Sequence, residues 1–326
     1  MACLTNTDKL AIVRAMWKIR RDHSRRTDLD RITMLDWLRE ARQTQNAINR
    51  FWRQVLVSAV NEELDRMAAA HGFQVFWLGM LACANSYEMG VPDVPLGKLY
   101  SAGAWQRIGA VHIHTRASVE RFDIAEGIAR AAQTADGSHA ADYYICALPF
   151  ERLDAIAPEL GIDTHPFEHS PITGIHLWFD RPVTELANAT LLDRTIQWMF
   201  NKSQGRYVQF VVSASRALAD MSRADVIALA LREGQEFFPE IARAKLERAH
   251  VIKELRATFS ARPGMERLRP GAVTGVRNVF LAGDWTRSGW PATMEGAVRS
   301  GYLAAEAVAA ASGRPAKFLK HDTDLG

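Results

Sequence analysis

The chain of 326 residues is long enough for one large domain or two ordinary ones, and its 48% apolar and 24% charged residues are typical of a globular protein. Forty basic and 37 acidic side chains give a net charge of +3, too small a surplus to indicate a nucleic-acid-binding protein. The three cysteines lack CxxC spacing, which favours a reduced, cytoplasmic protein. The apolar run near residues 75–84 is too short to span a bilayer, so the protein is expected to be soluble or to lie on the inner membrane surface.

Residues 1–71 contain neither glycine nor proline, and their apolar residues recur at helical spacing. We predict three helices here, the third continuing towards Met67, with Thr33, Asp36 and Asn46 as caps or first-turn residues. The defining apolar positions are Leu10, Val13 and Trp17, then Met34, Leu35, Trp37 and Leu38, and then Ile48, Phe51, Trp52, Val55 and Leu56. A further helix is predicted over residues 73–84, before a turn-rich segment at 90–97.

After Gly103 the pattern changes to that of a sheet. Residues 110–123 alternate as a strand does, a hairpin is predicted to turn at Asp136-Gly137, and residues 142–149 read as a short buried strand that ends in a proline. A short helix is predicted from 151 to 165.

Three strands of an antiparallel sheet are predicted next, at 170–180, 195–202 and 207–215. A helix follows from Ser222, its N-cap, to Phe238, with Pro239 just past its end. Residues 245–259 read either as a strand or as a passage from helix to strand.

Residues 278–301, NVFLAGDWTRSGWPATMEGAVRSG, give the strongest site signal. A short apolar strand ends at Gly283-Asp284, and a glycine-containing loop leads to a helix predicted over residues 292–311. A helix N-terminus presents unpaired N–H groups and partial positive charge, glycine lets a ligand approach the backbone, and an aspartate accepts hydrogen bonds from hydroxyl groups such as those of a ribityl chain. Spacing alone leaves open the alternative of an ordinary strand–loop–helix crossover in which Asp284 caps a local group.

This stretch resembles the C-terminal flavin motif of the FAD-dependent amine oxidase and phytoene desaturase superfamily, and it is most similar to the squalene-associated branch, the hydroxysqualene dehydroxylases. The segments YYICALP, FFPE, KELRATFSARPG and NRFWRQVLVSAVNEE carry the same resemblance, which covers nearly the whole chain. It implies a mixed α/β fold in which a partial FAD-binding Rossmann-like domain is interleaved with a helical and antiparallel-sheet substrate domain. The implied segments are 1–102 (substrate domain, helices), 103–150 (FAD-binding domain), 151–261 (substrate domain, sheet and helices), 262–314 (FAD-binding domain) and 315–326 (tail).

The resemblance also implies where FAD lies. Asp284 would hydrogen-bond the ribityl–pyrophosphate portion, with Gly283 allowing close approach, and the backbone at Thr293 and Met294 would face the pyrimidine edge of the isoalloxazine. The other residues implied to lie at the cofactor are Trp290, Pro291 and Ala292 before the helix, Val119 as a backbone partner of the adenine, and Ala147 with Leu148 and Pro149 beside the dinucleotide. No catalytic side chain is assigned.

The superfamily opens with a βαβ unit carrying GxGxxG, which seats the pyrophosphate on a helix N-terminus. In this sequence the first glycine is Gly72 and no GxGxxG follows. We therefore expect a truncated or mis-started chain, or one whose partner is a separate Rossmann-bearing chain. On its own, this chain is expected to bind FAD weakly or not at all. We also expect the strands at 111–122 and 143–148, and the one ending at Asp284, to leave apolar faces and edges exposed.

On the substrate side, Thr293 stands where the amine oxidases have an aromatic residue before Met-Glu-Gly, which disfavours amine oxidation. Trp290-Pro291 is more typical of branches that handle terpenoids. The resemblance thus implies an apolar isoprenoid substrate and the reductive dehydroxylation of hydroxysqualene to squalene. The alternatives are a carotenoid or phytoene desaturase, and a non-catalytic remnant or partner subunit.

Several aromatic and apolar positions suit a long apolar channel, and the alternative is that they simply form the core. They are Phe51, Trp52, Phe76, Trp77, Trp178, Trp198, Met199 and Phe200. His112 and His114 fall on one face of a predicted strand, but no further ligand stands nearby, so no metal is expected.

The apolar stripe of the first helix is flanked by basic residues. This pattern favours a solvated helix face, and contact with an anionic membrane surface is the alternative. These basic residues are Lys9, Arg14, Lys18, Arg20, Arg21, Arg25 and Arg26.

Overall fold

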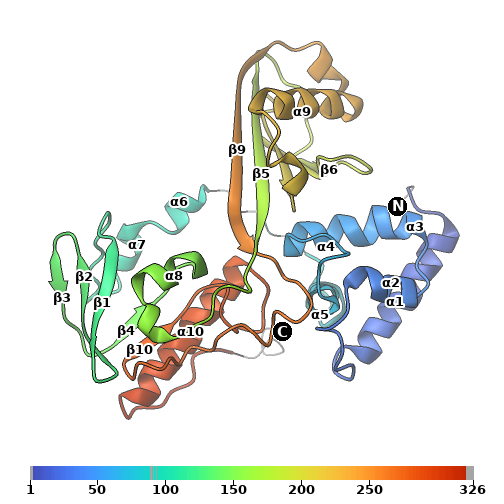
Figure 1. Ribbon diagram of the computed structural model, residues 1–326. Coiled ribbons are helices and arrows are strands. Elements are labelled where there is room, and N and C mark those ends of the chain that lie inside the picture. The colour runs from blue at the N-terminus through green and yellow to red at the C-terminus, as the bar shows by residue number, and fades with distance from the viewer. Residues whose placement is uncertain (1–2, 89, 91, 93, 321–326) are drawn as a thin grey trace.

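A computed structural model of the protein describes residues 3–320 except 89, 91 and 93, and shows a helical part, a tall antiparallel sheet and a smaller α/β part (Figure 1). In the helical part, two π-helical turns continue the α-helices. The elements are α1 (Asn6–Asp22), α2 (Met34–Glu40), α3 (Gln45–Ala47), η1 (Ile48–Trp52), α4 (Arg53–Val60), α5 (Ala69–Phe76) and η2 (Trp77–Leu81). The short α6 (Leu96–Leu99) and α7 (Ala102–Gln106) follow and lie on the side of the α/β part (Figure 1). Within the described ranges, no helix is long and apolar enough to cross a membrane.

Side-chain caps begin these helices. The Thr5 hydroxyl accepts a hydrogen bond from the Asp8 N–H at 3.2 Å and the Asp8 carboxylate accepts one from the Thr5 N–H at 2.8 Å, which forms a capping box at α1. Thr33 caps α2 as predicted, since its hydroxyl accepts from the Asp36 N–H at 3.1 Å. Asn46 lies in the first turn of α3, also as predicted.

The third predicted helix ends earlier than the sequence pattern indicates. It does not continue towards Met67, because Asn61 follows α4 with left-handed backbone geometry (φ 57°). The Asn61 side-chain amide donates to the Ser170 carbonyl at 2.9 Å, and its oxygen accepts from the Ala214 N–H at 2.7 Å. Contact with the sheet therefore sets the end of this helix. The helix predicted over 73–84 is also displaced, since α5 begins at Ala69 and η2 ends at Leu81.

The tall sheet is antiparallel, with strand order β6-β7-β8-β5-β9. Its strands are β5 (His169–Phe179), β6 (Asn188–Thr190), β7 (Trp198–Ser203), β8 (Tyr207–Ser213) and β9 (Leu246–Phe259), so residues 245–259 are resolved as strand and the antiparallel prediction is confirmed. Helix α9 (Arg223–Phe237), capped by Ser222 as predicted, packs its Val226 on one face of this sheet (Figure 1). The side chains buried there include Ile175, Leu177, Met199, Val208, Phe210 and Val251.

The smaller α/β part joins two separated stretches of the chain. It contains the antiparallel strands β1 (Val119–Ala125), β2 (Ile128–Thr134) and β3 (Gly137–His139), the parallel pair β4 (Tyr144–Cys146) and β10 (Val279–Leu281), and the helices α8 (Phe150–Ile156) and α10 (Met294–Ala311). Short 3₁₀ turns lie at Pro158–Leu160, Arg216–Leu218 and Pro239–Ala242. The predicted hairpin is confirmed. The helix predicted over 151–165 is shorter, because α8 ends at Ile156 and only the 3₁₀ turn at Pro158–Leu160 follows.

Two predictions about this part need correction. Residues 111–118 are not strand, and a positive φ of 62° at Arg116 interrupts extended structure there; His112 and His114 therefore share no strand face. The predicted exposure of strand faces holds for Ile145, which is 48% exposed, but not for residues 279–281, which are fully buried because neighbouring helices and loops cover both sides of β10.

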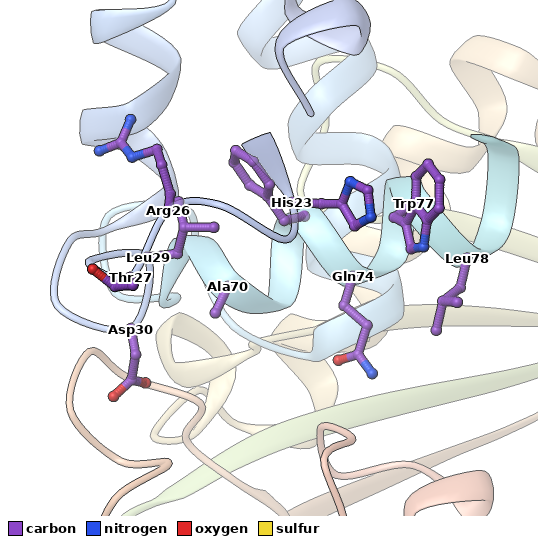
Figure 2. Close-up of a pocket in the computed structure, with 10 residues that line it drawn as sticks. His23, Arg26, Thr27, Leu29, Asp30, Ala70, Gln74, Trp77 and Leu78 are labelled. Carbon is purple, nitrogen blue, oxygen red and sulfur yellow. The ribbon is translucent and has the colours of Figure 1, made fainter. Parts of the chain in front are cut away.

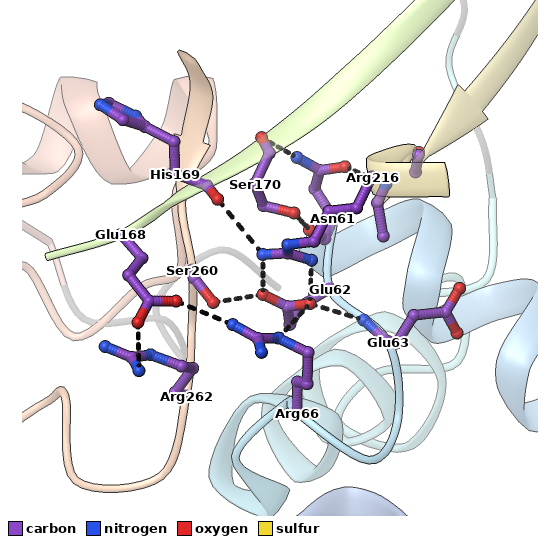
Figure 3. Close-up of polar contacts among 12 residues, drawn as sticks. Asn61, Glu62, Glu63, Arg66, Glu168, His169, Ser170, Arg216, Ser260 and Arg262 are labelled. Atoms are coloured by element: carbon purple, nitrogen blue, oxygen red, sulfur yellow. Dashed lines mark hydrogen bonds and ion pairs between the residues drawn. The ribbon is translucent and has the colours of Figure 1, made fainter. Parts of the chain in front are cut away.

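Glu62 links the helical part to the sheet (Figure 3). It is fully buried after the end of α4, and both of its carboxylate oxygens accept hydrogen bonds from Arg216, at 2.6 and 2.8 Å. The Ser260 hydroxyl, just beyond β9, donates to the same carboxylate. A buried charge is tolerated when it is paired in this way, so this cluster fixes the place where three separated segments cross.

Candidate functional site

The ends of two parallel strands meet at residues that the sequence singled out. β10 lies beside β4 with Leu281 paired to Cys146, and the Ala282 N–H donates to the Cys146 carbonyl at 3.0 Å. The two segments continue as 283–284 and 147–148 and leave the same edge of the sheet. In open α/β folds, ligands bind at this carboxyl edge.

Gly283 turns the chain from β10 toward α10. Its φ of 128° lies in the region that favours glycine, and a Cβ atom there would stand 2.8 Å from Nε1 of Trp285. The Gly283 N–H donates to Oγ of Ser300 in α10 at 2.8 Å, and the buried Trp285 donates from Nε1 to the Leu148 carbonyl at 2.9 Å. These contacts hold the 283–285 turn against residues 147–149 and against the helix.

The start of α10 is tightly folded. The Thr293 hydroxyl caps the helix by accepting from the Gly296 N–H at 3.0 Å. A Cβ atom on Gly296 would stand only 2.6 Å from the Pro291 carbonyl oxygen, so glycine lets the loop lie directly on the first turn. Met294, the first residue of the helix, is 59% exposed. The first-turn N–H groups thus lie beside an accessible surface where negative charge is favoured.

Asp284 is half-buried at the strand edge. Burial raises the pKa of its carboxyl group, and the Trp285 N–H and the positive charge of Arg269 oppose that rise. Among the residues that the structure describes, no side chain donates a hydrogen bond to this carboxylate. Besides its backbone contacts, this carboxylate has further lone pairs that can accept hydrogen bonds from ligand hydroxyl groups.

Arg269 organises the loop that follows Asp284, and the sequence analysis did not single it out. The side chain is fully buried; it donates to the carbonyl of Asp284 at 2.9 Å, to that of Trp285 at 3.2 Å and to that of Thr286. Glu266 balances its charge at 2.7 Å. Burial lowers the pKa of Arg269 and Glu266 opposes this change. A guanidinium group can hold three consecutive carbonyl groups in this way because it carries five N–H donors in a rigid plane.

The loop before α10 places a polar atom where the protein provides no partner for it. The indole nitrogen of Trp290 is buried and has no hydrogen-bond partner in the described part of the chain. The Arg299 guanidinium lies 5.3 Å from the centre of the indole ring, and Pro291 and Ala292 are buried beside it. Gln74 of α5 fixes the loop from the other side by donating to the Gly289 carbonyl at 2.8 Å. A buried unpaired donor is uncommon away from ligand sites.

The remaining predicted cofactor residues divide into two groups. Ala147 and Pro149 lie at the same sheet edge as Gly283, and Pro149 begins α8. Val119 is the first residue of β1, pairs with Thr134, and lies in the separate three-stranded sheet. The structure therefore brings together residues 147–149 and 283–294, while Val119 stands on a neighbouring element.

Two apolar cavities lie beside α4, and the smaller one adjoins the loop before α10. One, of about 340 Å³, lies between the helical part and this loop and is lined by Ala59, Gln74, Val75, Leu78, Gly79, Trp290, Pro291 and Thr293. The other, of about 700 Å³, lies between α4 and the sheet, and the residues that define it include Phe51, Val55, Ala59, Met80, Leu192, Trp198 and Phe200. Ala59 lines both cavities, so they approach each other at this residue.

A third cavity, of about 520 Å³, lies on the other side of α5 (Figure 2). His23 and Trp77 stack in its wall with ring centres 3.7 Å apart, and Asp30 stands at its far end. Gln74 and Leu78 line this cavity and also the smaller apolar one, so α5 and η2 separate the two.

The predicted channel residues therefore have different roles. Phe51, Trp198 and Phe200 line the larger apolar cavity, whereas Trp52, Phe76 and Met199 are core. Trp77 lines the third cavity, and Trp178 stacks on Tyr207 on the open face of the sheet. Ala59, Gln74 and Arg269 were missed because nothing in their local sequence marks them. No group of metal-ligating side chains is found in the described part of the chain.

These features fit a nucleotide-containing redox cofactor held at a sheet edge beside an apolar cavity. The chain belongs to the flavin containing amine oxidoreductase family, whose sequence profile matches residues 5–309. FAD is accordingly the cofactor, and the donor set described above fits it: the carboxylate of Asp284, the glycine turn at 283 and the exposed start of α10.

Individual relatives agree with this family. The chain is 36% identical over 165 residues to hydroxysqualene dehydroxylase of Sinorhizobium fredii, in an alignment that covers 51% of this chain and 38% of that protein. It is 25% identical over 322 residues to a probable zeta-carotene desaturase of Synechococcus elongatus, covering 86% of this chain and 67% of that protein. The structure superposes with a TM-score of 0.68 on an oxidoreductase from Methanosarcina mazei, at 16% identity over 92% of this chain and 72% of that one, which shows a shared fold. The chain thus matches well under half the length of the first of these relatives.

Proposed function

We propose that the protein is an FAD-dependent oxidoreductase that acts on a long apolar isoprenoid, with hydroxysqualene as substrate and squalene as product. The observation that carries this proposal is the pair of apolar cavities that approach each other at Ala59. Together they extend from Trp198 and Phe200 on the sheet to Thr293 at the start of α10. A hydrocarbon chain gains about 0.8 kcal/mol for each CH₂ group that it buries, so a mostly apolar route of this kind selects long unsubstituted substrates.

The residues of the chain have separate roles in this proposal. Asp284 accepts hydrogen bonds from the hydroxyl groups of the cofactor, and Arg269 keeps the 284–286 loop in the shape that this requires. Trp290 and Thr293 close the inner end of the route beside the first turn of α10, where backbone N–H groups favour negative charge. When bound in its reduced form, FAD supplies the hydride that replaces a hydroxyl group, which leaves with a proton as water. The apolar walls keep bulk water away from that carbon.

A carotenoid or phytoene desaturase is the second candidate. The similarity to the probable zeta-carotene desaturase supports it, because that alignment extends over 86% of this chain. A desaturase uses oxidised FAD and removes hydrogen from the substrate, so the two candidates give different products. The third alternative, a non-catalytic chain that acts only with a separate Rossmann-bearing chain, predicts turnover of neither substrate by this chain alone.

The first test is the visible absorbance spectrum of the purified chain, before and after addition of FAD and desalting. A retained, structured flavin band would contradict the expectation of weak binding and would permit direct assays. These compare hydroxysqualene with reduced FAD against phytoene with oxidised FAD, and identify the products by mass spectrometry. Squalene from the first reaction supports the proposal; desaturated carotenoid from the second overturns it in favour of the desaturase.

A variant at the junction of the cavities tests the route itself. Ala59→Trp should abolish turnover of a long substrate while flavin retention stays unchanged, because Ala59 lines both cavities but none of the predicted flavin residues is altered. Ala310→Trp, on the exposed end of α10, is the matched control and should behave like the parent chain. Equal activity in the two variants would show that the substrate does not pass Ala59.

A further inference from the structure

Helix α1 carries apolar side chains on two opposite faces. Ile12, Ala15 and Ile19 are buried against the rest of the helical part. Leu10, Val13 and Trp17 are exposed, by 51%, 51% and 66%. At about 100° per residue, these three side chains fall within an arc of about 60° on the side opposite the buried face. The apolar stripe that the sequence shows between basic residues is therefore the outer one.

Basic side chains border this outer stripe on both sides. Lys9 and Arg20 lie along one border, and Arg14 and Lys18 along the other. Over the described ranges, none of these four forms an ion pair, and the Arg20 guanidinium lies 5.8 Å from the ring of Trp17. The one acidic residue of the first turns, Asp8, is buried and faces away. The outer face of α1 is thus apolar at its centre and uniformly positive at its edges.

We propose that this face of α1 docks on the surface of an anionic lipid bilayer. Leu10, Val13 and Trp17 enter the boundary between head groups and acyl chains, and the four basic residues contact lipid phosphates. The charge pattern favours lipid over a second copy of the chain, because two copies stacked on this face would bring like charges together. The docking does not depend on the proposed reaction.

Vesicle co-sedimentation of the full chain tests the proposal. Vesicles of phosphatidylcholine with phosphatidylglycerol are compared with pure phosphatidylcholine, at low and high salt. We expect binding to the anionic vesicles that weakens with salt. The triple variant K9E/R14E/K18E should bind at least a hundredfold more weakly, since each basic residue near an anionic surface contributes about fivefold. The control R107E/R130E/R223E changes the net charge equally, at exposed positions outside α1, and should bind as the parent does.

A second measurement locates the contact without relying on charge. Bromine-labelled lipids quench tryptophans that enter the bilayer, so they should quench the parent more than the Trp17→Phe variant. Equal quenching of the two, equal binding of the two triple variants, or no preference for anionic vesicles would overturn the proposal. So would a dimer in sedimentation velocity that Trp17→Phe or Leu10→Ser dissociates, because the face would then be an interface between copies.

Discussion

The replacement of Arg269 by methionine tests how the cofactor loop is held. Methionine keeps much of the side-chain volume but removes the donors to the carbonyl groups of Asp284, Trp285 and Thr286 and leaves Glu266 unpaired. Hydrogen bonds to charged groups contribute about 1.5–3 kcal/mol each, while removal of a buried guanidinium also removes its desolvation cost. Because these terms oppose one another, we expect a net loss of about 3–5 kcal/mol in the free energy of unfolding, as for other broken buried ion pairs.

Urea unfolding followed by tryptophan fluorescence measures this loss. The control is Arg314→Met, which removes an exposed arginine and should change the free energy of unfolding by less than about 0.5 kcal/mol. Limited trypsin digestion adds a local readout, because Arg287 lies in the exposed part of the same loop and should be cut faster in Arg269→Met. If both variants unfold at the same urea concentration and are cut after Arg287 at equal rates, the carbonyl contacts of Arg269 do not hold the loop.

Three further predictions concern neighbouring residues. Burial lowers the pKa of His71 to about 4 from 6.5, so the folded state favours the neutral side chain. The free energy of unfolding should therefore be highest above pH 6.5 and fall by up to about 3 kcal/mol between pH 6.5 and 4. An unchanged pH dependence of urea unfolding in His71→Asn would refute this. Gly283→Ala should cost about 1–3 kcal/mol more than Gly289→Ala, because both have positive φ but only at Gly283 does the new Cβ meet another side chain; thermal unfolding of the two variants gives the comparison. Trp285→Phe should destabilise the protein by about 1 kcal/mol more than Trp290→Phe, because only Trp285 has a hydrogen-bond partner for its indole N–H; equal denaturation midpoints would contradict the assignment.

The elements that the sequence predicts well are those fixed by local chemistry. Ser222 and Thr33 cap helices through hydroxyl groups that accept from N–H donors three residues away, so the pattern is visible in a short window. The strand that ends at Gly283 is visible for the same reason, because its apolar run and its turn residue are adjacent. The predicted flavin motif is also visible in a short window, because one strand end and one helix start that follow each other in the sequence form it.

The features that sequence reading missed depend on distant partners. Asn61 ends α4 because its amide binds segments more than a hundred residues away, and nothing near it in the sequence signals that contact. Arg269 looks like a surface residue until the loop that it binds is placed around it. Ala59 becomes important only because two cavities approach each other at its methyl group. The outward orientation of the apolar stripe on α1 could not be predicted, because apolar spacing shows that a face exists but not which side it turns to the core.

The Glu62 cluster also constrains the order in which the chain folds. Its partners Arg216 and Ser260 lie 154 and 198 residues further along the sequence. The α9-covered sheet has an apolar core of its own, while the helical part shares one with the α/β part. Contacts between such distant residues form slowly, because the intervening loop must close first. On the ribosome, the helices can collapse early, but the Glu62 carboxylate waits for residue 260 to be synthesised. Until then the basic partner of Glu62 is Arg66, 3.5 Å away within the helical part itself, so the junction between the helices and the sheet is completed late.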